Sequence, residues 1–169
     1  MKKVLWIEDN TGIELPHLIT PVLFSGEYDL TIAHNASEAV QLLQHNPSNF
    51  DIIIFDLDLM PGNNPSLRKF YGESAGTEIS TKNLGGELLR LWLGKKTNFD
   101  QKTESELKLA TKLNPNHIGI LSVLANEFRE SDFYSELNLN PDFVVQKDAD
   151  MPREVLLKLI STIDKRSNK

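Results

Sequence analysis

The chain of 169 residues contains no cysteine, which excludes disulfide bonds, a thiolate nucleophile and a metal site built on cysteine sulfur. It also lacks a signal-peptide pattern and any run of about 18 apolar residues, the length needed to cross a membrane. Basic residues are outnumbered 18 to 24, and the net charge of -6 argues against non-specific nucleic-acid binding. We therefore expect a cytoplasmic protein that binds neither membranes nor nucleic acid directly.

Two short apolar runs end in carboxylates. Residues 4–7 lead into Glu8 and Asp9, and residues 52–55 lead into Asp56. Unbroken apolar runs of this length are typical of strands that are buried on both faces of a parallel α/β sheet. In such sheets, ligands bind just beyond the carboxyl ends of the strands. Two neighbouring strands would bring three carboxylates together, which predicts a divalent-cation site.

Strand patterns alternate along the chain with helical patterns. The segments typical of strands are 3–7, 28–33, 51–56, 117–123 and 142–146. Apolar residues follow a helical or partly helical pattern over 11–24, 36–43, 84–92, 107–113 and 156–163. This alternation predicts an α/β fold, with right-handed crossovers, a parallel sheet and helices on both of its faces.

Two stretches interrupt the alternation. Residues 63–83 are polar, contain Gly72 and Gly76, and show no sustained period. We expect an insertion without regular structure, which is either a lid or docking loop near the site or a functionally silent loop. The segment 95–116 is also long for a connection between elements.

Two further predicted strand ends carry polar groups, Ser122 and Lys147. With Glu8, Asp9 and Asp56, they give the chain a pattern that resembles the receiver domain of two-component response regulators over nearly its whole length. The resemblance implies a single receiver domain over 1–169, with a flavodoxin-like, doubly wound sheet of five parallel strands in the order 2-1-3-4-5. No output domain is expected, because little sequence follows the last predicted helix.

The resemblance also implies a metal site. In that family, an acidic pair after the first strand and an aspartate after the third bind Mg²⁺. Glu8 and Asp9 match the acidic pair, and Asp56 matches the aspartate. Asp58 matches the position whose backbone carbonyl binds the metal. Mg²⁺ is a hard cation that prefers oxygen ligands, so these groups suit it chemically.

The same family transfers a phosphoryl group from a sensor histidine kinase, or a phosphotransfer protein, to the aspartate that matches Asp56. Ser122 matches a residue that hydrogen-bonds the phosphoryl group, and Lys147 matches a lysine that offsets its charge. The resemblance thus implies a phosphorylated switch that signals to a downstream protein. It implies no enzymatic turnover beyond self-phosphorylation and slow autodephosphorylation.

Several positions depart from the family pattern. Pro61 lies five residues after Asp56, where the family usually places a proline four residues after its phosphoacceptor. Val144 stands at the position of the usual switch aromatic, three residues before Lys147, and Phe143 stands one residue earlier. These departures leave open a second interpretation, a degenerate receiver fold that binds partners without being phosphorylated.

The pair Asp56 and Asp58 also fits the Asp-x-Asp motif of haloacid-dehalogenase-type phosphatases. That family normally carries this motif near its N-terminus, and it needs a further acidic pair after the lysine strand, which is missing here.

The signalling face of receivers would include Phe128, Phe133 and Tyr134 in this chain. Core packing is the simpler interpretation of those three aromatic residues.

Overall fold

Five parallel strands form one sheet in the order β2-β1-β3-β4-β5, which is the order that the resemblance to receiver domains implies. The structure is a computed structural model that describes residues 1–10, 14–74 and 83–167. The strands are β1 (Lys2–Ile7), β2 (Tyr28–Ala33), β3 (Ile52–Phe55), β4 (Ile118–Ser122) and β5 (Val144–Gln146). Strand β1 lies between β2 and β3, and Ile7 pairs with both Ala33 and Phe55. This register brings the carboxyl ends of the central strands to one edge of the sheet.

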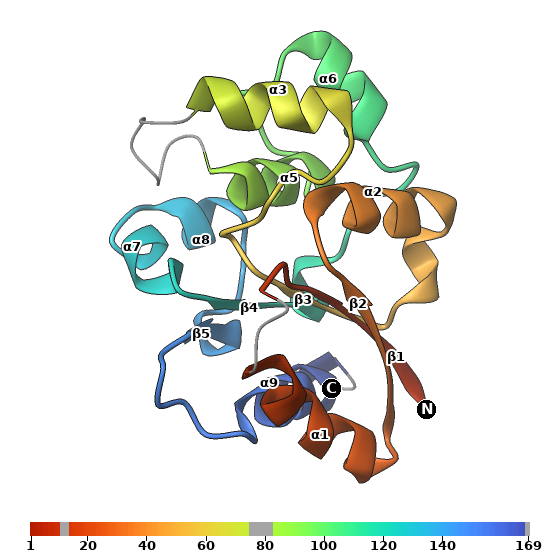
Figure 1. The fold of residues 1–169 in the computed structure, drawn as a ribbon, viewed down its shortest axis with the longest axis vertical. Coiled ribbons are helices and arrows are strands. Elements are labelled where there is room, and N and C mark those ends of the chain that lie inside the picture. Colours follow the sequence, from red (N-terminus) through yellow and green to blue (C-terminus); the bar gives the residue numbers. More distant parts are fainter. Residues whose placement is uncertain (11–13, 75–82, 168–169) are drawn as a thin grey trace.

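Helices cover both faces of the sheet. The helices of the described residues are α1 (Glu14–Ser25), α2 (Ala36–His45), α3 (Pro65–Ser74), α5 (Leu84–Trp92), α6 (Gln101–Leu107), α7 (Ala125–Arg129), α8 (Phe133–Glu136) and α9 (Val155–Ser167). Short 3₁₀ turns span Pro47–Asn49, Pro115–His117 and Pro141–Phe143. Helices α1 and α9 lie on one side of the sheet, and α2 and α5 lie on the other (Figure 1). No helix in the described part of the chain is both long enough and apolar enough to cross a membrane.

Each face of the sheet has its own hydrophobic core. In β1, Val4 and Trp6 pack in the core beneath α1 and α9. Leu5 and Ile7 pack in the core beneath α2 and α5. Successive side chains of a strand point to opposite faces, so a strand with cores on both sides is apolar throughout. This explains the unbroken apolar runs in the sequence.

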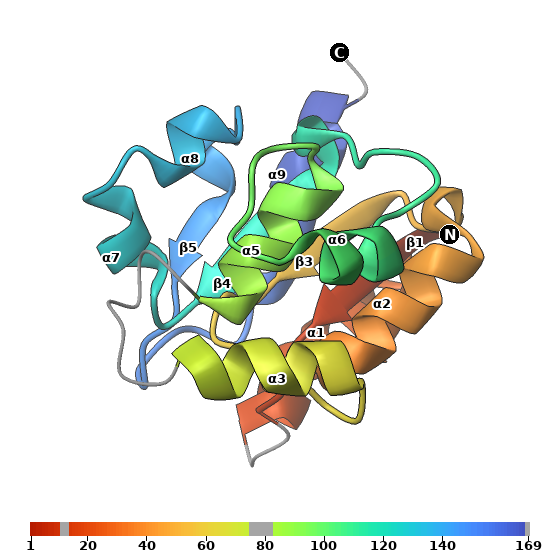
Figure 2. The ribbon, with the colours of Figure 1, turned by 90° about the horizontal axis from the view of Figure 1, so that it is seen from above.

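The expectation of an unstructured insertion over 63–83 is wrong for its first half. Residues 65–74 form α3, which lies outside α5 and away from the sheet (Figures 1 and 2). Asn64 caps this helix, because its side chain accepts a hydrogen bond from the Leu67 amide at 3.0 Å. Leu67 and Phe70 anchor it in the core, and the Phe70 ring lies 4.6 Å from that of Phe99. Residues 75–82 lie outside the described residues.

The helix expected over 107–113 is also wrong. Helix α6 covers Gln101–Leu107 instead, and Asp100 caps it by accepting the Thr103 amide at 2.7 Å. The residues that follow are irregular. Both ends of that irregular run bond to Trp92: its indole Nε1 donates to the Leu107 carbonyl at 3.0 Å, and its own carbonyl accepts the Leu113 amide at 2.9 Å.

The three aromatics considered for a signalling face belong to the core. Phe128, Phe133 and Tyr134 are buried in the cluster that includes α5. Phe133 makes edge-to-face contacts with both Phe128 and Tyr134, at ring-centre distances of 4.5 and 5.3 Å. The simpler interpretation of these residues, core packing, is therefore confirmed.

Candidate functional site

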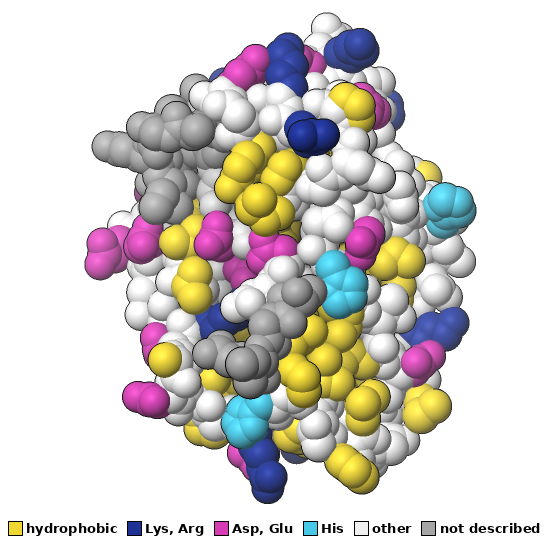
Figure 3. All heavy atoms as spheres, in the orientation of Figure 1, with side chains coloured by type: hydrophobic (Ala, Val, Ile, Leu, Met, Phe, Trp, Pro, Cys, Tyr) yellow, Lys and Arg dark blue, Asp and Glu magenta, His cyan; other side chains and the backbone are white. Residues whose placement is uncertain are grey.

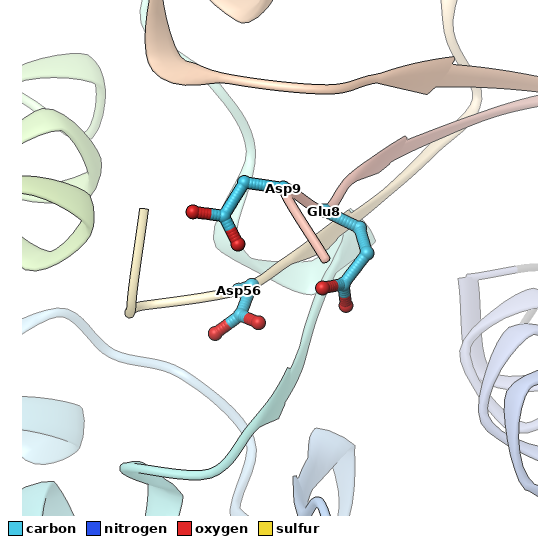
Figure 4. Close-up of side chains that lie close together, drawn as sticks. All are labelled: Glu8, Asp9 and Asp56. Carbon is cyan, nitrogen blue, oxygen red and sulfur yellow. The ribbon is translucent and has the colours of Figure 1, made fainter. Parts of the chain in front are cut away.

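The carboxylates that follow β1 and β3 meet at one edge of the sheet. Glu8, Asp9 and Asp56 each offer an oxygen, and these oxygens all lie within 4.8 Å of one another (Figure 4). Parallel pairing places the ends of β1 and β3 side by side, and the Asp56 amide donates to the Ile7 carbonyl at 3.0 Å. Glu8 and Asp56 are almost fully buried, at 1% and 2% exposure. Buried carboxylates so close together require positive charge nearby.

Lys147 supplies one positive charge. Its Nζ lies 2.6 Å from Glu8 Oε2 and 2.5 Å from Asp56 Oδ2. The lysine is fixed at the end of β5, where its backbone amide donates to the Ser122 carbonyl at 2.9 Å. Burial alone would lower the pKa of Lys147, but the Asp56 and Glu8 carboxylates outweigh burial and raise it. The side chain is therefore held as a cation.

Ser122 completes the surroundings of Asp56. Its hydroxyl donates to Asp56 Oδ1 at 2.6 Å and accepts from the backbone amides of Leu57 and Leu124, each at 3.2 Å. The Asp58 amide donates to the same Asp56 oxygen at 3.0 Å. Asp56 is thus held on one oxygen by Ser122 and the Asp58 amide, and on the other by Lys147.

One lysine does not balance the charge of this site. Burial, followed by the nearby Asp56 charge, raises the pKa of Glu8 to about 7. Burial also raises the pKa of both Asp9 and Asp58, to which the Asp56 charge adds. The donor atoms are all oxygens, and their negative charge exceeds that of the single cation. This donor set fits Mg²⁺, which takes carboxylate and carbonyl oxygens.

The raised pKa of Glu8 predicts that the metal-free protein loses stability as the pH rises. Between the ordinary pKa of 4.5 and about 7, the folded state binds more protons than the unfolded state. The contribution of Glu8 to the free energy of unfolding should therefore be highest below the ordinary pKa and fall by up to about 3 kcal/mol as the pH reaches the folded value. Urea unfolding at about pH 5 and about pH 8 measures the effect, and Glu8→Gln should flatten it. An equal slope in this variant would contradict the assignment to Glu8.

One contact of the site joins the acidic pair to a backbone group. The Met60 amide donates to Asp9 Oδ2 at 2.7 Å, so the loop after β3 contacts the acidic pair directly. No side-chain motif could have indicated this contact, because the donor is a backbone group.

Hydrophobic side chains are exposed on the segments around the acidic cluster. Met60 follows β3 and is 53% exposed, and Val123 follows β4 and is 45% exposed. A groove beside Asp9 is lined by Met60, Arg68 and Tyr71, among others. Figure 3 shows acidic and hydrophobic side chains next to each other on one face of the molecule. The described part of the 63–83 insertion therefore borders the site through α3.

Comparison with known proteins supports the fold. No protein-family model and no curated protein matches the chain in sequence. A receiver domain protein (CheY-like) from Methanospirillum hungatei JF-1 is 18% identical, with a TM-score of 0.54 over 99% of this chain and 98% of that chain. A response regulator receiver domain protein from Clostridium thermocellum is 14% identical, with a TM-score of 0.52 over the same shares. The bacteriophytochrome response regulator AtBRR is 15% identical, with a TM-score of 0.50 over 97% and 93%. The chain therefore has the fold of response regulator receiver domains.

Proposed function

We propose that this protein is a phosphoacceptor signalling switch of a two-component or phosphorelay system, which accepts a phosphoryl group on Asp56 in the presence of Mg²⁺. The observation that carries the proposal is the setting of Asp56. This carboxylate is buried between Lys147 and Ser122, and it lies beside the acidic pair at the carboxyl edge of a receiver-type sheet. Carboxylates that are merely solvated at strand ends have no such partners.

Each residue has a chemical role in the proposed transfer. An ionised Asp56 oxygen forms the new bond to phosphorus, while the phosphorus–nitrogen bond of a phosphohistidine breaks. The electron pair of that bond stays on nitrogen, and the imidazole, already protonated on its other nitrogen, leaves as a neutral ring. Lys147 offsets charge on the phosphoryl oxygens. The Ser122 hydroxyl, which now donates to Asp56 Oδ1, can turn its hydrogen to a phosphoryl oxygen instead. That exchange is a local change able to bias a two-state element.

The acidic side chains would hold the metal ion. Glu8, Asp9 and Asp56 would bind it with the backbone carbonyl of Asp58. When bound, Mg²⁺ supplies the positive charge that lets an ionised carboxylate and a phosphoryl group approach each other. The shortage of cations around Glu8 and Asp9 supports this assignment.

We infer that the partners are proteins: a sensor histidine kinase or phosphotransfer protein as donor, and a downstream protein as target. The exposed side chains of Met60 and Tyr71, which together line the groove beside Asp9, support this inference, because contiguous exposed apolar surface commonly contacts proteins. The proposal includes no catalytic turnover beyond self-phosphorylation and slow autodephosphorylation.

One observation favours the second function, a receiver fold that binds partners without phosphorylation. Phe143, the aromatic nearest the usual switch position, is buried in the core beneath α9. Val144, which holds that position, packs in the opposite core. The position three residues before Lys147 therefore holds no switch aromatic. The surroundings of Asp56 are nevertheless complete.

Phosphorylation by acetyl phosphate tests the proposed function. With Mg²⁺, the intact mass of the wild-type protein should increase by one phosphoryl group, and Asp56→Asn should show no increase. Steady release of p-nitrophenol from p-nitrophenyl phosphate should be negligible, whereas a haloacid-dehalogenase-type phosphatase would sustain it. A wild-type protein that gains no mass would favour the unphosphorylated interaction module.

A further inference from the structure

The loop between β3 and α3 is held against the N-terminus of α2. The Ala36 amide donates to the Met60 carbonyl at 2.9 Å. The Ser37 hydroxyl donates to the Pro61 carbonyl at 2.5 Å and accepts from the Asn64 amide at 2.8 Å. Ser37 is only 3% exposed, so water cannot readily replace these bonds. This single hydroxyl joins two points of the loop to α2.

Gly62 allows this close approach. Its φ is +73°, a conformation that side-chain-bearing residues rarely adopt. A Cβ atom at this position would lie 2.3 Å from Asn35 Oδ1 and 2.7 Å from Ser37 Oγ. Asn35 is itself fixed, because it caps α2 by accepting the Glu38 amide at 3.0 Å. The contact between the loop and α2 therefore leaves no room for a side chain at position 62, and Asn35 cannot readily move away.

The other end of the same loop contacts the carboxylates of the site. The Met60 amide donates to Asp9 Oδ2, and the Asp58 amide donates to Asp56 Oδ1. Met60 thus bonds to Asp9 through its amide and to α2 through its carbonyl. We call the hydrogen bonds of Ala36 and Ser37 to the loop the clamp. Residues 58–60 connect this clamp to the acidic cluster.

We propose that Ser37 is a positioning residue for the metal site. Its hydroxyl fixes the loop that carries one more residue before Pro61 than receivers usually have. The fixed loop then holds the Met60 amide on Asp9 and the Asp58 backbone next to Asp56. Without the hydroxyl, the loop samples more conformations. Metal binding then has to restrict the loop, which lowers the affinity for the metal. This inference rests on the proposed function only in assuming that the cluster binds Mg²⁺.

The test is the Mg²⁺ dissociation constant, measured by titration of amide NMR signals without any phosphodonor. Ser37→Ala should bind Mg²⁺ about three- to tenfold more weakly, as expected for loss of one buried hydrogen-bonding group. Gly62→Ala disturbs the same contact from the loop side and should weaken binding at least as much. Thr97→Val is the matched control, because its hydroxyl also donates and accepts within a loop, through Glu104 and the Phe99 amide. The control should bind Mg²⁺ like the wild type.

Hydrogen exchange in the wild-type protein provides a second measurement that needs no variant. If the clamp stabilises the metal-bound site, the metal must stabilise the clamp by linkage. Addition of Mg²⁺ should therefore slow exchange of the Ala36 and Asn64 amides, which bond to the loop and to Ser37, outside the acidic cluster. Unchanged exchange at these two amides would overturn the proposal.

The outcomes separate this inference from the proposed function. A wild-type protein that binds no Mg²⁺ would overturn both. A wild type that binds Mg²⁺ and is phosphorylated, together with Ser37→Ala and Gly62→Ala proteins of wild-type affinity, would overturn only the role of Ser37. A variant that is less stable but binds Mg²⁺ normally would show that Ser37 is structural and nothing more.

Discussion

Replacement of Lys147 by alanine is expected to abolish phosphorylation of Asp56 and to destabilise the metal-free protein by about 3–5 kcal/mol, as for loss of one partner of a buried ion pair. The ammonium group contacts both Glu8 and Asp56, and both carboxylates are almost fully buried. Its removal leaves them facing each other without a cation. Urea unfolding without metal measures the stability, and intact mass after acetyl phosphate treatment measures phosphorylation.

Two variants show whether charge causes this loss. Lys158→Ala removes an exposed lysine from α9 and should change the free energy of unfolding by less than about 0.5 kcal/mol. Adding Glu8→Gln to Lys147→Ala should restore part of the stability, because one of the unpaired carboxylates is then neutral. A double variant no more stable than Lys147→Ala alone would show that lost packing, and not charge, explains the effect.

Gly85→Ala is expected to damage both stability and phosphorylation. Helix α5 approaches the segment after β3 so closely that a Cβ at Gly85 would lie 2.4 Å from the Leu57 carbonyl oxygen. A backbone atom cannot move aside as a flexible side chain can, so the helix or the loop must shift. Overpacking of this kind costs about 1–3 kcal/mol. Because Leu57 follows Asp56 and donates its amide to Ser122, the shift should also slow phosphorylation.

Gly72→Ala is the control for this prediction. Gly72 lies in α3, and a Cβ there would meet nothing within 4 Å. Alanine restricts the unfolded chain more than glycine does, so this variant should be more stable by about 0.5–1 kcal/mol. Urea unfolding and the rate of mass increase with acetyl phosphate should be measured for both variants. A Gly85→Ala protein that behaves like Gly72→Ala would contradict the close contact with Leu57.

The sheet and the acidic cluster were predictable because burial on both faces leaves a strong trace in a sequence. A strand such as β3 can only be apolar, and its first carboxylate then marks the edge of the sheet. Parallel pairing of β1 with β3 then places Glu8 beside Asp56, so no further sequence motif is needed to predict that they meet. Ser122 and Lys147 carry a weaker signal, since Ser122 lies within β4 and Gln146 already ends β5 before Lys147. Their roles followed from the resemblance to receiver domains.

The sequence pattern did not predict helix α3, because few of its side chains are buried. Leu67 and Phe70 anchor it, which is too short an apolar stripe to show a helical period. The sequence Asn64-Pro65 was nevertheless a usable signal, since asparagine caps helices and proline suits their first turn. In the segment after α6, Leu113 suggested helical spacing, but its backbone amide bonds to Trp92 from an irregular chain.

The path of the loop after β3 could not be predicted because backbone groups of the loop make its hydrogen bonds to α2 and to Asp9. The position of Pro61 showed that the loop departs from the usual pattern, but not where it goes. Its path depends on Ser37, a residue in a different element that carries no motif. Such contacts depend on the tertiary arrangement of α2 and β3, which the local sequence does not specify.

The two tryptophans lie on opposite sides of the sheet. Trp6 is buried beneath α1 and α9, and its indole Nε1 has no hydrogen-bond partner among the described residues. Trp92 is buried on the other side, where its indole donates to Leu107. Fluorescence from a protein that keeps only one of them would therefore report on a single layer. Emission spectra could show whether an event at the carboxylate edge reaches one layer or both.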